Sequence, residues 1–291
     1  MKILVTGKYG QVGHCLVKLL EAQSDLEYLA LDREQLDITN ALQVNKIVNE
    51  FKPNIIVNAA AYTAVDKAEQ EPELAYAINR DGPLNLALAA NYVNAAIIHI
   101  STDYVFDGKG VECYTESAVT SPQSEYGRSK LAGEHAVAQT CKKYIILRTA
   151  WVFGEHGNNF VKTMLRLAKT RTSLGVVADQ FGGPTYAGDI ASAILKITKQ
   201  IISDSHSYGI YHFSGTPYVS WHAFSKKIFE IALEQNVLSQ SVQVKPITTL
   251  DYPTPAKRPA NSRLSCDKIN NEYGIKQSDW QDALARIKEY S

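Results

Sequence analysis

Short apolar runs alternate with amphipathic segments through the first half of the chain. Each run has the length of a buried strand, and strands are predicted at Ile3–Val5, Glu27–Asp32, Ile55–Ala60, Ala96–Ser101 and Tyr144–Arg148. Helical periodicity lies between them and predicts helices at Gly13–Glu21, Ala41–Phe51, Glu73–Asn91 and Glu125–Thr140. This alternation predicts an α/β fold, a Rossmann-like doubly wound parallel sheet with helices on both faces.

The pattern loosens after about Trp151. Further helices are predicted at Asn159–Arg171, Asp189–Lys199, Trp221–Gln235 and Asp279–Glu289, with one short strand at Gly209–Phe213. The prolines of Tyr252–Pro259 exclude a regular element there. We therefore expect residues 1–150, with helices near 186–200, to form a dinucleotide-binding domain. Residues 151–291 should form mainly a small substrate-binding lobe over the carboxyl ends of the strands, where ligands bind in open α/β sheets.

A glycine-rich loop, Gly7-Lys8-Tyr9-Gly10-Gln11-Val12-Gly13, follows the first predicted strand and leads into a helix. This context distinguishes a dinucleotide-binding loop from an ordinary βα turn, which is the alternative. The first glycine permits a tight turn, the second a close approach of the backbone to a diphosphate, and the third close helix packing. The helix N-terminus favours phosphate. The coenzyme-binding candidates here are Gly7, Tyr9, Gly10, Gln11, Val12 and Gly13.

Further coenzyme contacts are expected at the ends of the next two strands. Asp32 lies about twenty residues after the glycine loop, where an acidic residue binds the ribose hydroxyls, and this favours NADH. Arg33 could instead hold a 2′-phosphate, so NADPH remains open. Asp37 and Ile38 are candidates for the adenine edge. The small residues Ala59, Ala60 and Ala61 would let the nicotinamide ribose approach the backbone, although small residues also pack helices onto sheets.

Tyr126 and Lys130 are separated by one helical turn and lie on the same helix face. A lysine ammonium lowers the pKa of a nearby phenol, so the pair can exchange a proton near neutral pH. Thr102 ends the strand upstream and could hydrogen-bond a reacting carbonyl, or it could cap a turn. The order of glycine loop, hydroxyl-bearing strand end and Tyr/Lys helix is that of a nicotinamide-dependent carbonyl reductase. The catalytic candidates are Thr102, Tyr126 and Lys130, and Tyr126 and Lys130 are also expected to contact the coenzyme.

The composition of the chain limits the classes of partner that can be expected. The 291 residues carry 30 Lys+Arg and 30 Asp+Glu, so the net charge of zero gives no reason to expect a nucleic-acid partner. The four cysteines form no CxxC pair, which argues against a zinc site, and fit a reducing compartment. No apolar stretch approaches the ~20 residues of a membrane span. A cytoplasmic protein without a membrane partner is therefore expected.

The chain resembles the extended short-chain dehydrogenases/reductases and, within them, the dTDP-4-dehydrorhamnose reductase family. The resemblance lies in the glycine loop and in the segments 57–69, 101–108, 126–134, 148–154, 157–160 and 258–264, in order over nearly the whole chain. It implies NADH- or NADPH-dependent reduction of the 4-keto group of dTDP-4-dehydro-L-rhamnose, the last step of dTDP-L-rhamnose synthesis. A different sugar-nucleotide reductase or epimerase, or a non-catalytic subunit that keeps the fold, remains an alternative.

The resemblance also implies contacts with a dTDP-sugar. The family's Thr-Asp-Tyr falls on Thr102, Asp103 and Tyr104, and its substrate-facing Trp on Trp151, although a core Trp is the alternative. The implied substrate-binding residues are Thr63, Val65, Thr102, Asp103, Tyr104, Trp151, Asn158, Asn159, Arg258, Asn261 and Arg263. The cationic segment with Arg258 and Arg263 suits a diphosphate.

The chain departs from the family at a metal position. Some members hold Mg²⁺ at a dimer interface with acidic residues, and Cys15 and Gly188 occupy the corresponding positions here. A hard cation prefers oxygen ligands. No metal is therefore expected, and the chain should be a monomer or a weak homodimer.

Overall fold

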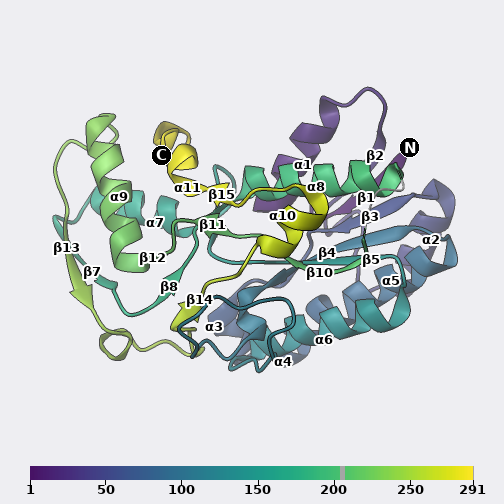
Figure 1. Cartoon of the computed structure of the whole chain (residues 1–291), viewed down its shortest axis with the longest axis horizontal. Coiled ribbons are helices and arrows are strands. Elements are labelled where there is room, and N and C mark those ends of the chain that lie inside the picture. The colour runs from purple at the N-terminus through teal and green to yellow at the C-terminus, as the bar shows by residue number, and fades with distance from the viewer. Residues whose placement is uncertain (204–206, 291) are drawn as a thin grey trace.

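The computed structural model describes residues 1–203 and 207–290, and its centre is a six-stranded sheet (Figure 1). The strands, in sheet order, are β10 (Gly209–His212), β5 (Tyr144–Thr149), β4 (Ala96–Thr102), β3 (Ile55–Asn58), β1 (Lys2–Thr6) and β2 (Glu27–Leu31). All neighbouring pairs are parallel. The chain leaves β1 toward β2 on one side and later returns to β3 on the other, which creates a switch point beside β1.

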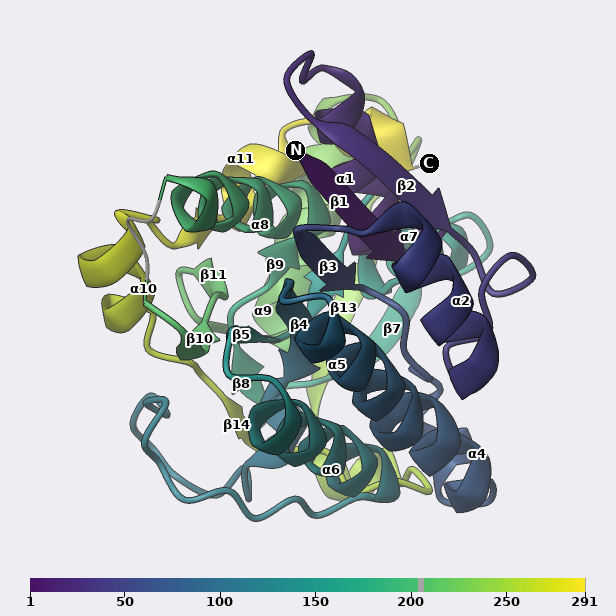
Figure 2. The ribbon, with the colours of Figure 1, turned by 90° about the vertical axis from the view of Figure 1, so that its right-hand side faces the viewer.

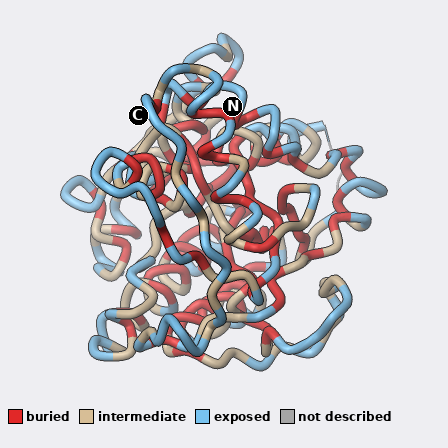
Figure 3. The backbone as a smooth tube through the Cα atoms, turned by 90° about the vertical axis from the view of Figure 1, so that its left-hand side faces the viewer, coloured by how far each residue is buried: buried red, intermediate tan, exposed pale blue. Residues whose placement is uncertain are grey.

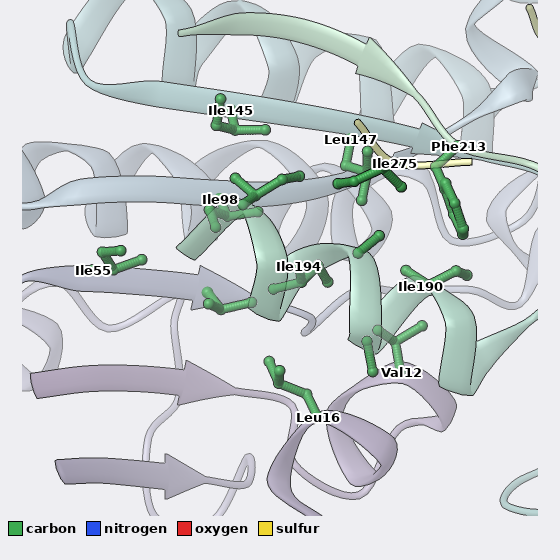
Figure 4. Close-up of a cluster of buried hydrophobic side chains, with 14 of the residues drawn as sticks. Val12, Leu16, Ile55, Ile98, Ile145, Leu147, Ile190, Ile194, Phe213 and Ile275 are labelled. Carbon is green, nitrogen blue, oxygen red and sulfur yellow. The ribbon is translucent and has the colours of Figure 1, made fainter. Parts of the chain in front are cut away.

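Helices cover both faces of the sheet (Figure 2). One face carries α1 (Gln11–Glu21) and α8 (Ala187–Ile202), and the other carries α2 (Ala41–Phe51), α5 (Gly82–Tyr92) and α6 (Glu125–Thr140). Alternate strand side chains enter opposite layers: Ile3 packs with α1 and α8, whereas Leu4 packs with α2 and α5. Figure 4 shows the first layer, which is built from apolar side chains of α1, α8 and the strands. The predicted doubly wound α/β fold is therefore confirmed.

A second hydrophobic core lies beyond the carboxyl ends of the strands (Figure 1, left). It is formed by α7 (Phe160–Ala168), α9 (Trp221–Glu234), α11 (Trp280–Leu284) and the parallel pair β7 (Ser173–Val177) and β13 (Gln243–Ile247). Two-residue strands join this part to the rest: β6 (Val152–Phe153) with β9 (Thr185–Tyr186), β12 (Val219–Ser220) with β8 (Phe181–Gly182) and β14 (Asn261–Ser262), and β11 (Gly215–Thr216) with β15 (Ser278–Asp279). Figure 3 shows buried backbone running through both parts, with exposed segments outside.

Several predicted elements differ in detail. The helix expected over Glu73–Asn91 is divided into α4 (Pro72–Tyr76), a π-helical turn at Ala77–Asp81, and α5. Pro83 has no N–H to donate to the carbonyl of Asn79, which disrupts the regular ladder there. The last helix ends at Leu284 and is followed by a 3₁₀ turn at Ile287–Tyr290. The helices α3 (Val65–Ala68) and α10 (Asp267–Tyr273), the strands β7 and β13, and the two-residue strands were not predicted from the sequence. No helix within residues 1–203 and 207–290 is long and apolar enough to cross a membrane.

Candidate active site

A cleft of about 690 Å³ opens at the switch point, where the loop after β1 meets the end of β3. Gly7 has a φ of +75°, and a Cβ on it would lie 2.7 Å from the backbone of Ala59 and Ala60, so only glycine fits. The predicted coenzyme residues that line the cleft are Gly7, Tyr9, Gly10, Asp32, Arg33, Asp37, Ile38, Ala59, Ala60 and Ala61, joined by the predicted substrate residue Thr63. The glycine loop after β1, the segment after β2 and the segment after β3 are separate in the sequence, and the structure brings them together at this cleft.

The N-terminus of α1 suits a diphosphate. Gly10 is the N-cap and has no side chain to cap the helix, so the first N–H groups of α1 are left to a ligand. Gly13 is required for a different reason: a Cβ there would lie 2.2 Å from the Gly7 carbonyl oxygen. Val12 is buried in the core beside α8, and Gln11 accepts a hydrogen bond from the Asn159 amide at 3.1 Å. The glycines thus form a cradle that fits a dinucleotide.

The ribose end of the cleft contains an ion pair that sequence reasoning missed. Asp32 Oδ1 accepts hydrogen bonds from the backbone N–H groups of Glu34 and Gln35 at 2.9 and 3.0 Å. Its other oxygen, Oδ2, lies 3.3 Å from Lys8 Nζ. The Gln35 amide and the Lys8 ammonium both lower the pKa of Asp32. Lys8 stands inside the glycine loop, and its chemistry, a cation at a phosphate loop, was the available signal.

The catalytic candidates meet where β4 runs beside α6. Tyr126, Thr102 and Lys130 are 8%, 6% and 2% exposed, so all three are shielded from water. The Thr102 hydroxyl lies close enough to Tyr126 to lower the pKa of its phenol, and Lys130 Nζ donates to the carbonyl oxygen of Ile100 at 2.8 Å. Tyr126 also contacts Tyr104 edge to face, with ring centroids 5.4 Å apart. The predicted trio is therefore assembled in one buried place.

The electrostatics of this trio differ from our expectation. Burial raises the pKa of Tyr126, and the nearby Thr102 hydroxyl partly opposes this effect. The Lys130 ammonium is directed to the Ile100 carbonyl oxygen, so the expected lowering of the phenol pKa by Lys130 is not seen in this arrangement and stays a prediction. Burial lowers the pKa of Lys130 to about 8, and the Glu134 carboxylate partly offsets this. Lys130 thus keeps its positive charge at neutral pH.

A buried ion pair fixes α6 against the sheet directly behind this trio. Arg148 on β5 binds Glu134 through two hydrogen bonds, Nε to Oε1 at 2.9 Å and Nη2 to Oε2 at 2.6 Å. The Ser101 hydroxyl donates to Glu134 Oε1 at 2.5 Å. Since Glu134 follows Lys130 by one turn, this paired and fully buried contact holds the catalytic helix in register with β4.

Asp103 follows Thr102 and is a buried carboxyl, 4% exposed. Its Oδ1 accepts a hydrogen bond from Thr102 Oγ1 at 3.1 Å. Its Oδ2 is buried without a hydrogen-bond partner of normal geometry, although the Ser262 hydroxyl is near enough to lower the carboxyl pKa. Burial dominates and raises the pKa of Asp103 to about 6. A buried polar atom without a partner in the described structure fits the prediction that Asp103 contacts a ligand.

The proline-rich segment crosses from the second core to the mouth of the site. Arg258 donates from Nη2 to Asp66 Oδ2 at 2.6 Å and from Nη1 to the Tyr104 hydroxyl at 3.1 Å. Asp66 lies on α3 next to the predicted residue Val65, and sequence reasoning did not select it. Arg258 is therefore joined to two elements of the dinucleotide-binding part and is placed beside the catalytic tyrosine.

Asn261 and Arg263, in contrast, are engaged mainly with the backbone of a neighbouring loop. The Asn261 amide donates to the Glu112 carbonyl oxygen at 2.7 Å, and Arg263 Nη1 donates to that of Val111 at 2.8 Å. Arg263 also lies over the Phe181 ring, 5.0 Å from its centroid. Their predicted contacts with substrate remain predictions.

Trp151 is half-buried, and its backbone lies in the left-handed region with a φ of +51°. Its ring stacks on Trp221 at a centroid distance of 3.5 Å and lies so close to Gly182 that a Cβ there would be 2.6 Å away. A non-glycine residue in the left-handed region stores backbone strain, which is often found at functional sites. The Trp221 ring covers one face of the Trp151 ring. The contact of Trp151 with a sugar remains a prediction.

The predicted turn residues Asn158 and Asn159 differ from each other. Asn158 is exposed, whereas Asn159 is buried and caps α7 by accepting a hydrogen bond from the Lys162 N–H at 3.1 Å. The Asn159 amide also donates to the Gly154 carbonyl oxygen at 2.7 Å. Its side chain therefore has a structural role, and Asn158 is the better placed of the two for a ligand.

Neither residue at the family's metal position, Cys15 or Gly188, is acidic, although the Glu155 carboxylate lies close enough to raise the pKa of Cys15 and accepts a hydrogen bond from the Tyr186 hydroxyl at 2.5 Å. Cys15 is buried, and burial raises the pKa of its thiol to about 11. A Cβ on Gly188 would lie 2.3 Å from the Tyr186 ring, so no acidic side chain fits there. Within the described part of the chain, no group of three or more His, Cys, Asp or Glu could hold a metal ion. Independence of metal remains a prediction to be tested.

A parallel sheet with a glycine-loop cleft at its switch point, and a buried Thr/Tyr/Lys trio beside it, defines a Rossmann-type oxidoreductase of the extended short-chain dehydrogenase/reductase class. The chain belongs to the RmlD substrate binding domain family, whose sequence model matches residues 1–290.

Individual relatives agree over the full length. The chain is 54% identical to the dTDP-4-dehydrorhamnose reductase of Aggregatibacter actinomycetemcomitans, over 100% of this chain and 99% of that protein. The structure of a dTDP-4-dehydrorhamnose reductase from Clostridium acetobutylicum is similar with a TM-score of 0.91, 45% identity and 98% coverage of both chains. That of the Bacillus anthracis enzyme in complex with NADP has a TM-score of 0.89 and 41% identity, covering 100% of this chain and 99% of that one.

Proposed function

We propose that this protein reduces the 4-keto group of dTDP-4-dehydro-L-rhamnose to give dTDP-L-rhamnose, with NADH or NADPH as the reductant. The observation that carries the proposal is the buried meeting of Thr102, Tyr126 and Lys130 beside a cleft that fits a dinucleotide. The relatives named above act on this substrate by name, and one of them holds NADP.

The residues of this chain would divide the chemistry as follows. The nicotinamide coenzyme, when bound, supplies the hydride that reaches the carbonyl carbon. Tyr126 donates its phenolic proton to the oxygen that becomes an alkoxide. Lys130 uses one of its three N–H donors on Ile100 and retains two, and its charge stabilises the tyrosinate that remains. A positioned general acid of this kind contributes about 10²–10⁴ in rate.

Substrate binding would use the mouth of the site. Asp103 and Tyr104 lie directly beyond Thr102, and Arg258 adds a cation that suits a diphosphate. Thr63, at the cleft, and Val65, at the start of α3, border the same opening. Trp151 packs against the small cluster of Val105, Phe106, Ala150 and Leu264, and Asn158 lies exposed in the loop before α7. These assignments rest on placement and on the family, and each can be tested by a single substitution.

We propose further that the protein acts in the cytoplasm as a monomer or weak homodimer. All four cysteines are free thiols, which supports a reducing compartment.

The decisive experiment is an assay of NAD(P)H oxidation against a panel of 4-keto sugar nucleotides. Rapid oxidation with dTDP-4-dehydro-L-rhamnose, and much slower oxidation with other sugars, would support the proposal. A purified protein that retains bound coenzyme and interconverts sugars without net oxidation would instead indicate an epimerase.

A further inference from the structure

Asp66, on α3, connects the dinucleotide-binding part to the proline-rich segment, residues 252–259. One carboxylate oxygen, Oδ2, accepts a hydrogen bond from Arg258 Nη2 at 2.6 Å. The other oxygen, Oδ1, accepts a hydrogen bond from the backbone N–H of Ala256 at 3.2 Å. Asp66 therefore binds the backbone of this segment and also the charged end of a side chain that leaves the segment two residues later.

The same geometry leaves part of the Arg258 guanidinium for a ligand. A guanidinium group has five N–H donors. In the described structure Arg258 uses one on Asp66 and one on the Tyr104 hydroxyl, at 3.1 Å. The Tyr104 ring contacts Tyr126 edge to face, so the other donors of Arg258 lie near the catalytic tyrosine. The planar donor pattern of a guanidinium matches the oxygens of a diphosphate.

Stabilisation of the fold is a weak explanation for this ion pair. The Asp66 and Arg258 side chains are 40% and 29% exposed, and ion pairs with such exposure contribute little to the free energy of unfolding because water screens them. The prolines at positions 253, 255 and 259 already restrict the backbone of the segment. The Arg258 side chain, in contrast, is long and flexible. Fixing it before a ligand arrives removes an entropy cost from binding.

We propose that Asp66 is a positioning residue that orients the Arg258 guanidinium for the diphosphate of the sugar nucleotide. This role rests on the proposed function and deepens it. Asp66 does not bind the diphosphate itself, because its own negative charge would repel that group and both of its oxygens are engaged by the proline-rich segment. It acts through Arg258. A nucleotide that carries a diphosphate therefore gains affinity from Asp66, whereas a nucleoside without phosphate does not.

Asp66→Ala should raise KM for dTDP-4-dehydro-L-rhamnose about tenfold and leave kcat within about threefold, because the cost of ordering one long side chain returns to the binding step. The inhibition constant of dTDP should rise by the same factor, and that of thymidine should not change. Asp66→Asn keeps an oxygen that can accept from the Ala256 N–H but loses the charge, so its KM should lie between those of the wild type and Asp66→Ala. If Asp66→Ala does not fold, Asp66→Asn carries the same comparison of dTDP with thymidine.

Glu27→Ala is the matched control. Glu27 forms a similarly exposed ion pair with Lys2, at 3.3 Å, at the amino end of the central sheet and so at the end opposite the cleft. Its removal should change neither KM nor the inhibition by dTDP. Circular dichroism and the dissociation constant of NADPH, measured for every variant, control for folding of the dinucleotide-binding part.

A double-mutant cycle tests whether Asp66 acts through Arg258. Arg258→Ala alone should raise KM about a hundredfold, the expected loss of hydrogen bonds to a charged group. Adding Asp66→Ala to that variant should change KM less than twofold, because the residue that Asp66 orients is already absent. Additive losses would overturn the positioning role.

Three further results would also overturn it. Tighter inhibition by dTDP in Asp66→Ala would show that the carboxylate competes with the diphosphate for Arg258. Equal weakening of dTDP and thymidine would show that Asp66 shapes the nucleoside pocket or the fold. An unchanged KM would show that Arg258 does not need Asp66.

Failure of this role can be distinguished from failure of the proposed function. If the wild-type enzyme reduces dTDP-4-dehydro-L-rhamnose and Asp66→Ala has the wild-type KM, the positioning role fails and the function stands. If the wild-type enzyme oxidises NAD(P)H with no 4-keto sugar nucleotide, the function fails. Calorimetric titration of the same variants with dTDP then still decides the role of Asp66.

Discussion

The Lys8 ammonium lies 3.3 Å from Asp32 Oδ2, so the glycine loop and the second strand are joined by an ion pair at the ribose end of the cleft. A ribose 2′-hydroxyl would donate to Asp32, and a 2′-phosphate would be attracted to Lys8. Asp32 thus favours NADH and Lys8 favours NADPH. The two side chains are paired with each other in the structure, which contains neither coenzyme. Asp32, the acidic residue typical of NADH binding, therefore does not exclude NADPH in this chain.

Coenzyme preference should therefore change in opposite directions in two variants. Asp32→Ala should weaken the binding of NADH more than that of NADPH. Lys8→Met should weaken the binding of NADPH roughly tenfold, which is the expected loss of one charge-assisted hydrogen bond, and should leave the binding of NADH nearly unchanged. Dissociation constants from coenzyme fluorescence would measure both. Asp32→Asn is the matched control, because its amide oxygen can still accept from the N–H groups of Glu34 and Gln35. Equal losses for both coenzymes would show that the pair does not sense the 2′-position.

Tyr126→Phe should lower kcat at least a hundredfold and leave coenzyme affinity almost unchanged, because only the proton donor is lost. The phenylalanine ring can keep the edge-to-face contact with Tyr104, so the fold should be preserved. Steady-state kinetics with coenzyme titration would measure this, and circular dichroism would control for folding. A variant that retains most of its activity would remove Tyr126 from the mechanism.

Sequence patterns predicted the sheet and the Tyr126/Lys130 helix because these rest on local signals, namely apolar runs and a glycine loop in its context. The division of the predicted helix at Asn79 could not be foreseen from periodicity, since it depends on Pro83 and on the buried contact of Asn79 with Tyr62. The Lys8–Asp32 and Arg258–Asp66 pairs were also missed. They join residues far apart in the chain. The cation of Lys8 in a phosphate loop was a signal for a binding role, but the sequence alone does not show that Lys8 pairs with Asp32 or Arg258 with Asp66.

Asp103→Asn should stabilise the protein at neutral pH. The folded-state pKa of about 6 is above the usual 3.8, so the folded protein binds the proton more tightly than the unfolded chain. In the wild-type protein, Asp103 makes its full contribution to the free energy of unfolding below about pH 4. This contribution is lost as the pH rises to about 6. The variant does not titrate, so its advantage should grow over this window to about 2–3 kcal/mol and then stay constant. Urea unfolding at pH 4 and pH 7.5 would measure it, and an equal difference at both values would contradict this origin.

Trp151→Ala should raise KM for the sugar nucleotide roughly 10–100-fold, from loss of stacking and one hydrogen bond. Trp221→Ala is the informative comparison, because it removes the ring that stacks on Trp151 without removing the indole itself. Kinetics of both variants, with direct measurement of NADH binding, would separate the roles. If Trp151→Ala unfolds or loses NADH binding as well, Trp151 acts in the core rather than on the sugar.

Activity should be unchanged by EDTA, and the protein should be a monomer in dilute solution. Mg²⁺ is bound through carboxylates and water, but the thiol of Cys15 stays protonated because burial raises its pKa to about 11. At Gly188 the Tyr186 ring fills the space that an acidic side chain would need. Activity after exhaustive chelation, and mass by light scattering with and without Mg²⁺, test both statements. Loss of activity that Mg²⁺ restores, or a doubling of mass that requires Mg²⁺, would show that other ligands complete the site.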